Sequence, residues 1–126
     1  MRICLVGGLG TLGADIVDAY KSKHKLFIID DGVESCLATD DLPPSVAVIS
    51  ANVAHQEKYK DALIEFIPEL VIYLATTVSA DQKRGFESVL GLSNICEIGS
   101  MTSNFPILYI QSFLTRDVSK PVNSNS

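Results

Sequence analysis

The sequence of 126 residues predicts a single α/β domain with a doubly wound parallel sheet, because apolar runs alternate with segments of helical period. Each run is short and nearly continuous, which is typical of strands buried on both faces of a sheet. The runs are residues 3–6, 26–29, 46–49, 71–75 and 107–110. Parallel strands joined by right-handed crossovers make a doubly wound sheet, for which we expect five strands in the Rossmann order 3-2-1-4-5.

Three segments between the apolar runs have the spacing of helices. The first stripe, expected to face the sheet, is Leu12, Ile16, Ala19 and Tyr20; the second is Tyr59, Ala62, Leu63, Phe66 and Ile67, ended by Pro68. The third helix, over residues 86–98, has Phe86, Val89, Leu90 and Ser93 on one face. Residues 31–44 have turn residues, paired prolines and no clear period, so we predict a long loop there with at most a short helical turn. All four tyrosines are interpreted as core residues.

Composition excludes several functions. The net charge is −5, and the basic residues are scattered except for Lys21, Lys23 and Lys25 around His24. That run is too short to follow a phosphate backbone, so we interpret it as a solvated turn and expect no nucleic-acid partner. No apolar segment has the length of a membrane span, so no membrane contact is expected.

The cysteines Cys4, Cys36 and Cys96 are odd in number and form no CxxC pair. This pattern predicts neither a disulfide framework nor a metal site, and it favours the reducing cytoplasm. Cys4 lies within the first apolar run and is interpreted as a small buried hydrophobic residue.

The first apolar run leads directly into Gly7-Gly8-Leu9-Gly10-Thr11-Leu12-Gly13, and a helical stripe follows. Glycines at this spacing also occur in ordinary turns, but between a strand and a helix they predict a Rossmann-type dinucleotide site. Gly7 or Gly8 permits the tight turn, Gly10 lets backbone approach a pyrophosphate, and Gly13 lets the helix pack closely. The helix N-terminus, with Thr11 and Leu12, then faces the phosphates.

The second apolar run ends in Asp30, where the dinucleotide fingerprint places an acid that hydrogen-bonds the adenosine ribose. Between Asp31 and Asp61 the only Arg or Lys residues are Lys58 and Lys60, beyond the third run, so nothing near the second run would compensate a 2′-phosphate. NAD is therefore favoured over NADP. Asp31 is interpreted as a solvent-facing turn residue.

In a doubly wound sheet the ligand lies at the carboxyl ends of the strands, between the first and the fourth. This rule places Leu74, Ala75, Thr76 and Thr77 beside the glycine loop. Small residues there would let a cofactor pass close to backbone, although a simple strand exit would have the same composition.

These motifs resemble the extended short-chain dehydrogenase/reductase family, which includes NAD-dependent nucleotide-sugar epimerases and dehydratases. The resemblance covers nearly the whole chain. The family's glycine pattern matches Gly7, Gly10 and Gly13; its acid after the second strand matches Asp30; and its adenine-binding pair is similar to Asn52-Val53, with Asn in place of Asp. Its stretch before and along the fourth strand is similar to residues 68–76, with Thr76 for the usual Ala, and its Asn-x-x-Gly-x-x-Asn helix is similar to residues 88–94, with Ser88 for the first Asn.

The resemblance also implies a catalytic Ser or Thr after the fifth strand, for which Ser112 is the candidate, with Thr115 behind it. The family pairs this residue with a Tyr and a Lys four positions later. None of the tyrosines here is followed by such a lysine. We therefore expect an NAD-binding domain over residues 1–116 and a polar tail over residues 117–126, truncated before the Tyr-x-x-x-Lys helix.

Three functional hypotheses remain open. The first is the NAD-binding portion of a nucleotide-sugar epimerase, dehydratase or reductase. The second is a non-catalytic module that binds or senses NAD, and the third is a truncated product that folds poorly alone. Since an uncovered sheet edge invites association, a homodimer is a further expectation.

Overall fold

The computed structural model describes residues 1–7, 11–30, 42–75, 82–102 and 104–111, and these form a five-stranded parallel sheet flanked by helices. The elements in chain order are β1 (Arg2–Val6), α1 (Thr11–Tyr20), β2 (Lys25–Asp30), β3 (Val46–Ser50), the 3₁₀ turn η2 (Gln56–Lys58), α2 (Lys60–Phe66), β4 (Leu70–Ala75), α3 (Gln82–Met101) and β5 (Ile107–Gln111). The sheet has the predicted order β3-β2-β1-β4-β5, and every strand pair is parallel. The predicted topology is confirmed.

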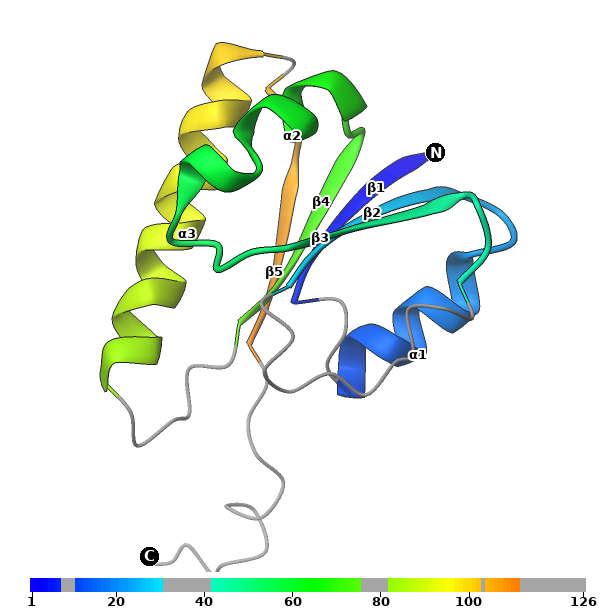
Figure 1. The fold of residues 1–126 in the computed structure, drawn as a ribbon, viewed down its shortest axis with the longest axis horizontal. Helices are drawn as coiled ribbons and strands as arrows, with labels where there is room; N and C mark the ends of the chain where they lie inside the picture. Colours follow the sequence, from blue (N-terminus) through cyan, green and yellow to red (C-terminus); the bar gives the residue numbers. More distant parts are fainter. Residues whose placement is uncertain (8–10, 31–41, 76–81, 103, 112–126) are drawn as a thin grey trace, which may run out of the picture.

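The helices lie in two layers, with α1 on one face of the sheet and α2 and α3 on the other (Figure 1). Alternate residues of the central strands supply the two cores, because successive side chains of a strand point to opposite faces. Under α2 and α3, Leu63, Ile95 and Ile98 pack with Cys4, Val6, Phe27, Ile29, Val71 and Tyr73. Under α1, Val17 packs with Ile3, Leu5, Leu26, Ile28 and Ile72.

The predicted core stripe of α1 is wrong by one residue. Gly13 and Val17 are buried and Ile16 is half-buried, whereas Ala19 and Tyr20 are exposed. Gly13 and Val17 are one helical turn apart and therefore share a face. Because glycine has no side chain, a helix that turns this face to the sheet can approach it closely. Tyr20 instead makes an edge contact with the ring of His24.

Helix α3 extends beyond the predicted residues 86–98 at both ends, and its buried face differs from the apolar stripe named from the sequence. Phe86, Val89, Leu90 and Ser93 are exposed. The buried positions are Gly91, Ile95, Ile98 and Gly99, which follow one another at helical spacing.

Helix α2 ends as predicted before Pro68, but Ile67 does not join the core. Ile67 adopts the left-handed conformation with φ of 53° and caps the helix, and its side chain is 53% exposed. The next strand, β4, begins three residues later.

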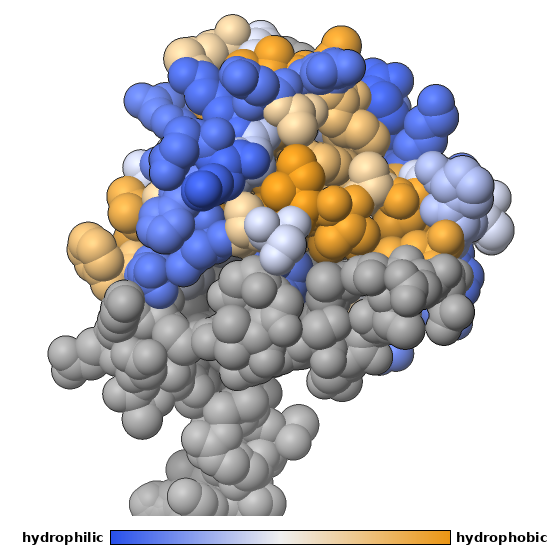
Figure 2. All heavy atoms as spheres, in the orientation of Figure 1, coloured by the Kyte–Doolittle hydropathy of each residue, from blue (hydrophilic) through white to orange (hydrophobic). Residues whose placement is uncertain are grey.

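Both edge strands leave apolar side chains accessible. On β5, Leu108 and Tyr109 are exposed, so the interpretation of Tyr109 as a core residue is wrong. On β3, Val46, Val48 and Ile49 are half-buried, and hydrophobic side chains are visible in the middle of the face along which β3 runs (Figure 2). Strands at an edge have a neighbour on one side only, which explains why their side chains are covered less completely.

Candidate dinucleotide site

The first glycine after β1 has a geometry that other residues do not adopt easily. Gly7 has φ of 84°, in the left-handed region, and its N–H donates to the carbonyl of Ile29 at 2.8 Å. A Cβ atom built on Gly7 would lie 2.8 Å from the carbonyl oxygen of Leu74. The turn therefore requires glycine both for its backbone conformation and for lack of space.

The same contact brings the end of β4 beside the start of the glycine loop. Leu74 lies at the carboxyl end of β4, and β1 pairs directly with β4 along the register from Ile3 to Val6. The prediction that Leu74 lies beside the loop is confirmed. Of Ala75 the structure describes the backbone, which pairs with Gln111 of β5.

Helix α1 begins at Thr11, soon after β1 ends, so its N-terminus lies toward the carboxyl ends of the strands. The first N–H groups of a helix have no partner within the helix, and they carry the positive end of its dipole. Gly13 is buried in the first turn of the helix. The positions of the start of α1 and of Gly13 are those that the phosphate-binding prediction requires, and their role in binding stays a prediction.

Asp30 is the last residue of β2 and follows Ile29, which binds the N–H of Gly7. Its side chain is half-buried, and its carbonyl accepts from the N–H of Ala51 at 2.9 Å. Asp30 is thus placed at the carboxyl edge of the sheet, one strand away from the glycine turn.

The turn after β3 is fixed by polar contacts with α3. The Oδ1 atom of Asn52 accepts from the N–H of Ala54 at 2.9 Å, and its Nδ2 atom donates to Glu87 Oε2 at 2.9 Å. A contact from Asn52 to an adenine would therefore use the second lone pair of Oδ1 or a backbone group. Glu87 was not identified from the sequence, where no motif distinguished it from other surface acids.

The carbonyl of Val53 accepts two hydrogen bonds from side chains. The hydroxyl of Tyr59 donates to it at 2.6 Å, and Asn94 Nδ2 donates at 3.3 Å. The same Asn94 amide donates to the carbonyl of Ala54 at 3.1 Å. The last Asn of the Asn-x-x-Gly-x-x-Asn pattern therefore ties α3 to the turn that carries Asn52 and Val53.

The glycine of that pattern lets α3 pack directly on the site's edge. A Cβ atom on Gly91 would overlap Val53 Cγ1 and lie 2.6 Å from Tyr73 Oη. The hydroxyl of Tyr73 donates to the carbonyl of Ser88 at 2.5 Å. This contact uses the backbone of Ser88, so the replacement of the usual Asn by Ser does not affect it.

Burial and hydrogen bonding make Tyr59 and Tyr73 unsuited to proton transfer. Desolvation raises the pKa of Tyr73 to about 12, and desolvation likewise raises the pKa of Tyr59. Both hydroxyls already donate to backbone carbonyls. Burial also raises the pKa of the Cys4 thiol, which lies in the core as predicted.

Several predicted site residues lie outside the described residues, namely Gly10, Thr76 and Ser112, together with Thr115, Asp31, Cys36 and the tail over residues 117–126. Of Thr11 and Leu12 the backbone is described as the start of α1. Within the described part of the chain, no three His, Cys, Asp or Glu side chains gather as a metal site would require. None of the described helices is long and apolar enough to cross a membrane.

The parallel sheet in the order β3-β2-β1-β4-β5, with a glycine turn after β1 leading into α1, defines a Rossmann-type α/β fold. No protein-family model matches the sequence, and no curated protein matches it. Solved structures do match the fold. One is the Bordetella bronchiseptica enzyme WbmG in complex with NAD, with 23% identity and a TM-score of 0.74 over 86% of this chain and 36% of that chain.

Two other similar structures are a Thermus thermophilus UDP-glucose 4-epimerase in complex with NAD and a Bacillus anthracis dTDP-glucose 4,6-dehydratase in complex with NAD. The first is 22% identical with a TM-score of 0.66, covering 80% of this chain and 34% of that chain. The second is 16% identical with a TM-score of 0.64, covering 88% of this chain and 36% of that chain. The chain spans about a third of the length of these enzymes.

Proposed function

We propose that this chain is the NAD-binding portion of a nucleotide-sugar epimerase or dehydratase of the extended short-chain dehydrogenase/reductase type. The observation that carries the proposal is the turn at Gly7, where a positive φ and the carbonyl of Leu74 exclude any side chain. This turn brings the end of β4 beside the end of β1 and leads to the N-terminus of α1, whose first N–H groups have no partner within the helix and can bind phosphate. Support also comes from the NAD complexes whose folds are similar.

In this proposal the chain's own residues bind and orient the cofactor. Gly7, Gly10 and Gly13, with the backbone of Thr11 and Leu12, hold the pyrophosphate. Asp30 accepts a hydrogen bond from the adenosine ribose, and Asn52 and Val53 lie beside the adenine. Leu74, Ala75 and Thr76 line the side toward the nicotinamide, which when bound accepts or returns a hydride. Ser112, after β5, would hydrogen-bond the sugar.

A titration of the 126-residue chain with NAD and NADP by calorimetry tests the proposal. We expect tighter binding of NAD, because the carboxylate of Asp30 bonds the ribose hydroxyl and repels a 2′-phosphate. Asp30→Ala should weaken NAD binding about tenfold to a hundredfold, since a hydrogen bond to a charged group is worth about 1.5–3 kcal/mol. The ratio of the affinity for NAD to the affinity for NADP should also become smaller in Asp30→Ala.

Asp61→Ala is the matched control, because Asp61 is an exposed carboxylate at the start of α2. It should leave both affinities unchanged. Tighter binding of NADP than of NAD by the unmodified chain would overturn the assignment of Asp30, and no binding of either would overturn the proposal itself.

We further propose that these 126 residues alone do not turn over a nucleotide sugar. None of Tyr20, Tyr59, Tyr73 and Tyr109 has a lysine four residues later. Tyr59 and Tyr73 are buried donors to carbonyls, and Tyr20 lies at the C-terminus of α1, away from the carboxyl ends of the strands. No tyrosine of the described residues is therefore placed to act as the proton shuttle.

The measurement is a long incubation of the purified chain with NAD and a panel of UDP- and dTDP-sugars, following product formation and cofactor reduction. We expect no steady turnover. Turnover that persists in Ser112→Ala, after contaminating enzymes have been excluded, would show that a different set of residues performs the chemistry.

The second candidate is a module that binds or senses NAD without catalysis, which would need the proposed cofactor site and no Tyr-x-x-x-Lys pair. A Tyr-x-x-x-Lys in coding sequence downstream of residue 126 would exclude this module in favour of the enzyme.

We also propose a cytoplasmic location, supported by the free thiols of Cys4 and Cys96, and a homodimer. Sedimentation of the purified chain measures the oligomeric state.

A further inference from the structure

A cavity of about 400 Å³ lies at the amino-terminal end of the sheet, opposite the carboxyl ends where the dinucleotide is proposed to bind. It is formed where the turn after α1 meets the first residues of β1 and β2 and the residue before β4. The charged and titratable side chains that line it are Arg2, Lys21, Lys23, His24, Lys25 and Glu69. Its volume is within the range of small-molecule sites.

The cavity is a concentration of positive charge on an acidic chain. The whole sequence has 10 basic and 15 acidic residues, yet four of the basic side chains line this cavity with a single carboxylate, that of Glu69. A cation near the C-terminus of a helix interacts favourably with the negative end of the helix dipole, which accounts for Lys21 after α1. The dipole does not account for Arg2 and Lys25, which are at the starts of β1 and β2.

Two of the cations are not neutralised by neighbours. Lys21 Nζ pairs with Asp18 at 3.1 Å, but neither Lys23 nor Lys25 has an ion pair among the described residues. The Nδ1 atom of His24, between them, is buried without a hydrogen-bond partner in the described part of the chain. Since that atom is closed to solvent, it does not face a ligand in the cavity; the groups that line the cavity without an ion-pair partner among the described residues are the ammonium groups of Lys23 and Lys25.

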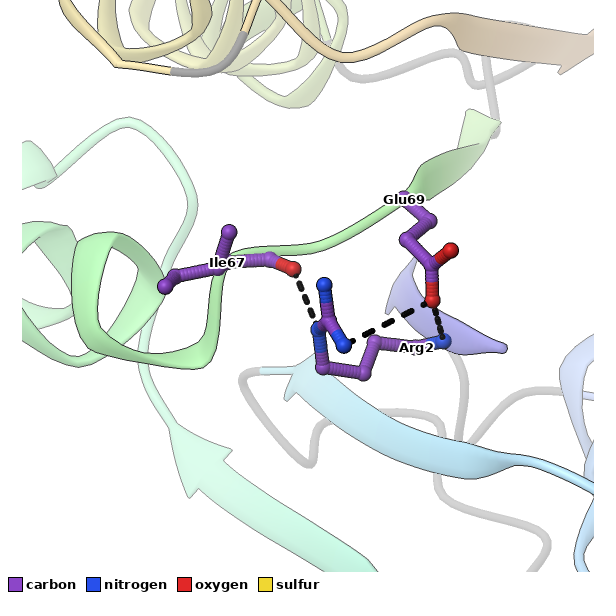
Figure 3. Close-up of polar contacts among 3 residues, drawn as sticks. All are labelled: Arg2, Ile67 and Glu69. Carbon is purple, nitrogen blue, oxygen red and sulfur yellow. Dashed lines mark hydrogen bonds and ion pairs between the residues drawn. The ribbon is translucent and has the colours of Figure 1, made fainter.

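Arg2 is oriented by contacts that leave much of its guanidinium available (Figure 3). Its Nε donates to the carbonyl of Ile67 at 2.7 Å, which the left-handed conformation of Ile67 presents. Its Nη1 atom is 3.7 Å from Glu69 Oε1, too far for a hydrogen bond. With both side chains nearly half exposed, this ion pair is weak and can be exchanged for a better acceptor.

Glu69 is held by the main chain and not by the guanidinium. Its Oε1 accepts from the N–H of Arg2 at 2.9 Å. This hydrogen bond, with the nearby charge of Arg2, lowers the pKa of Glu69, which is therefore ionised near neutral pH. Glu69 is thus a negative charge against which any bound anion must compete.

We propose that this cavity binds the phosphate or diphosphate group of a small molecule. Arg2 supplies a planar fork of N–H donors that matches phosphate oxygens, and Lys23 and Lys25 supply point charges. Because the cavity and the glycine turn lie at opposite ends of the strands, the site is separate from the proposed dinucleotide site. It would hold its ligand whether or not NAD is bound.

Titration of the isotope-labelled 126-residue chain with sodium pyrophosphate, at constant ionic strength, tests the proposal by nuclear magnetic resonance. We expect saturable shifts of the amides of residues 21–25, Arg2 and Ser45, which also lines the cavity. The titration is repeated with saturating NAD, because pyrophosphate could also occupy the glycine loop. The shifts at the cavity should persist, and they are distinguished by residue from any at residues 7–13.

Three variants sharpen the test. Lys23→Gln/Lys25→Gln should weaken pyrophosphate binding at least tenfold. Glu69→Gln keeps an acceptor for the N–H of Arg2 but removes the opposing charge, so it should tighten binding severalfold. Lys58→Gln/Lys60→Gln, a matched removal of two charges at η2 and the start of α2, should leave affinity unchanged.

The proposal is overturned if no saturable shift occurs at residues 21–25, or if shifts occur only in the glycine loop. It is also overturned if both lysine pairs weaken binding equally, because that result reports net charge and not a site. All variants alter exposed or half-exposed side chains, and circular dichroism checks that each is folded.

Discussion

Gly91→Ala should lower the free energy of unfolding by about 2 kcal/mol, since overpacking costs typically about 1–3 kcal/mol. The added Cβ would overlap Val53 Cγ1 and meet the hydroxyl of Tyr73, which is already bonded to the carbonyl of Ser88. Neither neighbour has free space, because Tyr73 is only 1% exposed and the carbonyl of Val53 is bound by Tyr59 and Asn94. The strain outweighs the gain in helix propensity, which alone would favour Ala by about 1 kcal/mol.

Thermal or urea unfolding measures this effect, and the midpoint should fall by roughly 5–10 °C for a chain of this size. The unfolding midpoint of Gly91→Leu should be lower still. Ser93→Ala is the control on the exposed face of the same helix, and it should be neutral or slightly stabilising. If Gly91→Ala were as stable as the unmodified chain, α3 would not pack on Val53 and Tyr73 as described.

Gly10→Val should reduce NAD affinity at least a hundredfold, equivalent to about 2.8 kcal/mol. The glycine loop begins at Gly7, which has a left-handed conformation and lies against the carbonyl of Leu74. Helix α1 begins at Thr11, directly after Gly10. In the proposed function a side chain at Gly10 occupies the space through which the pyrophosphate reaches the backbone N–H groups. The loss should therefore appear in binding rather than in folding.

Calorimetry with NAD gives the affinity, and an unfolding curve shows whether the variant is folded. Ser93→Val adds the same valine side chain at an exposed position of α3 and should bind NAD normally. Unchanged affinity in a folded Gly10→Val chain would remove the central argument for a dinucleotide site. Binding of pyrophosphate in the cavity at the other end of the sheet should be unaffected by Gly10→Val.

The sequence by itself determined the strands and their order. Strands buried on both faces, such as β1 and β2, are read from continuous apolar runs, because every position along them must be apolar. Glycine spacing placed the tight turn at Gly7 or Gly8, and in the structure Gly7 has the left-handed conformation and the contact with Leu74 that require glycine. The lack of a Tyr-x-x-x-Lys pair is likewise a property of the sequence alone.

Only the tertiary structure decided which side of α1 and of α3 is buried, whereas the stripe of α2 was predicted correctly except for Ile67. Helical period defines a stripe, but the buried face depends on what packs against the helix, and the structure places Val17 inward in α1 and Ile95 inward in α3. Tyr20 and Phe86 are consequently exposed despite their apolar rings. The partners of Asn52 and the cavity around Arg2 also come from tertiary structure. They join residues far apart in the chain, and no local spacing encodes such contacts.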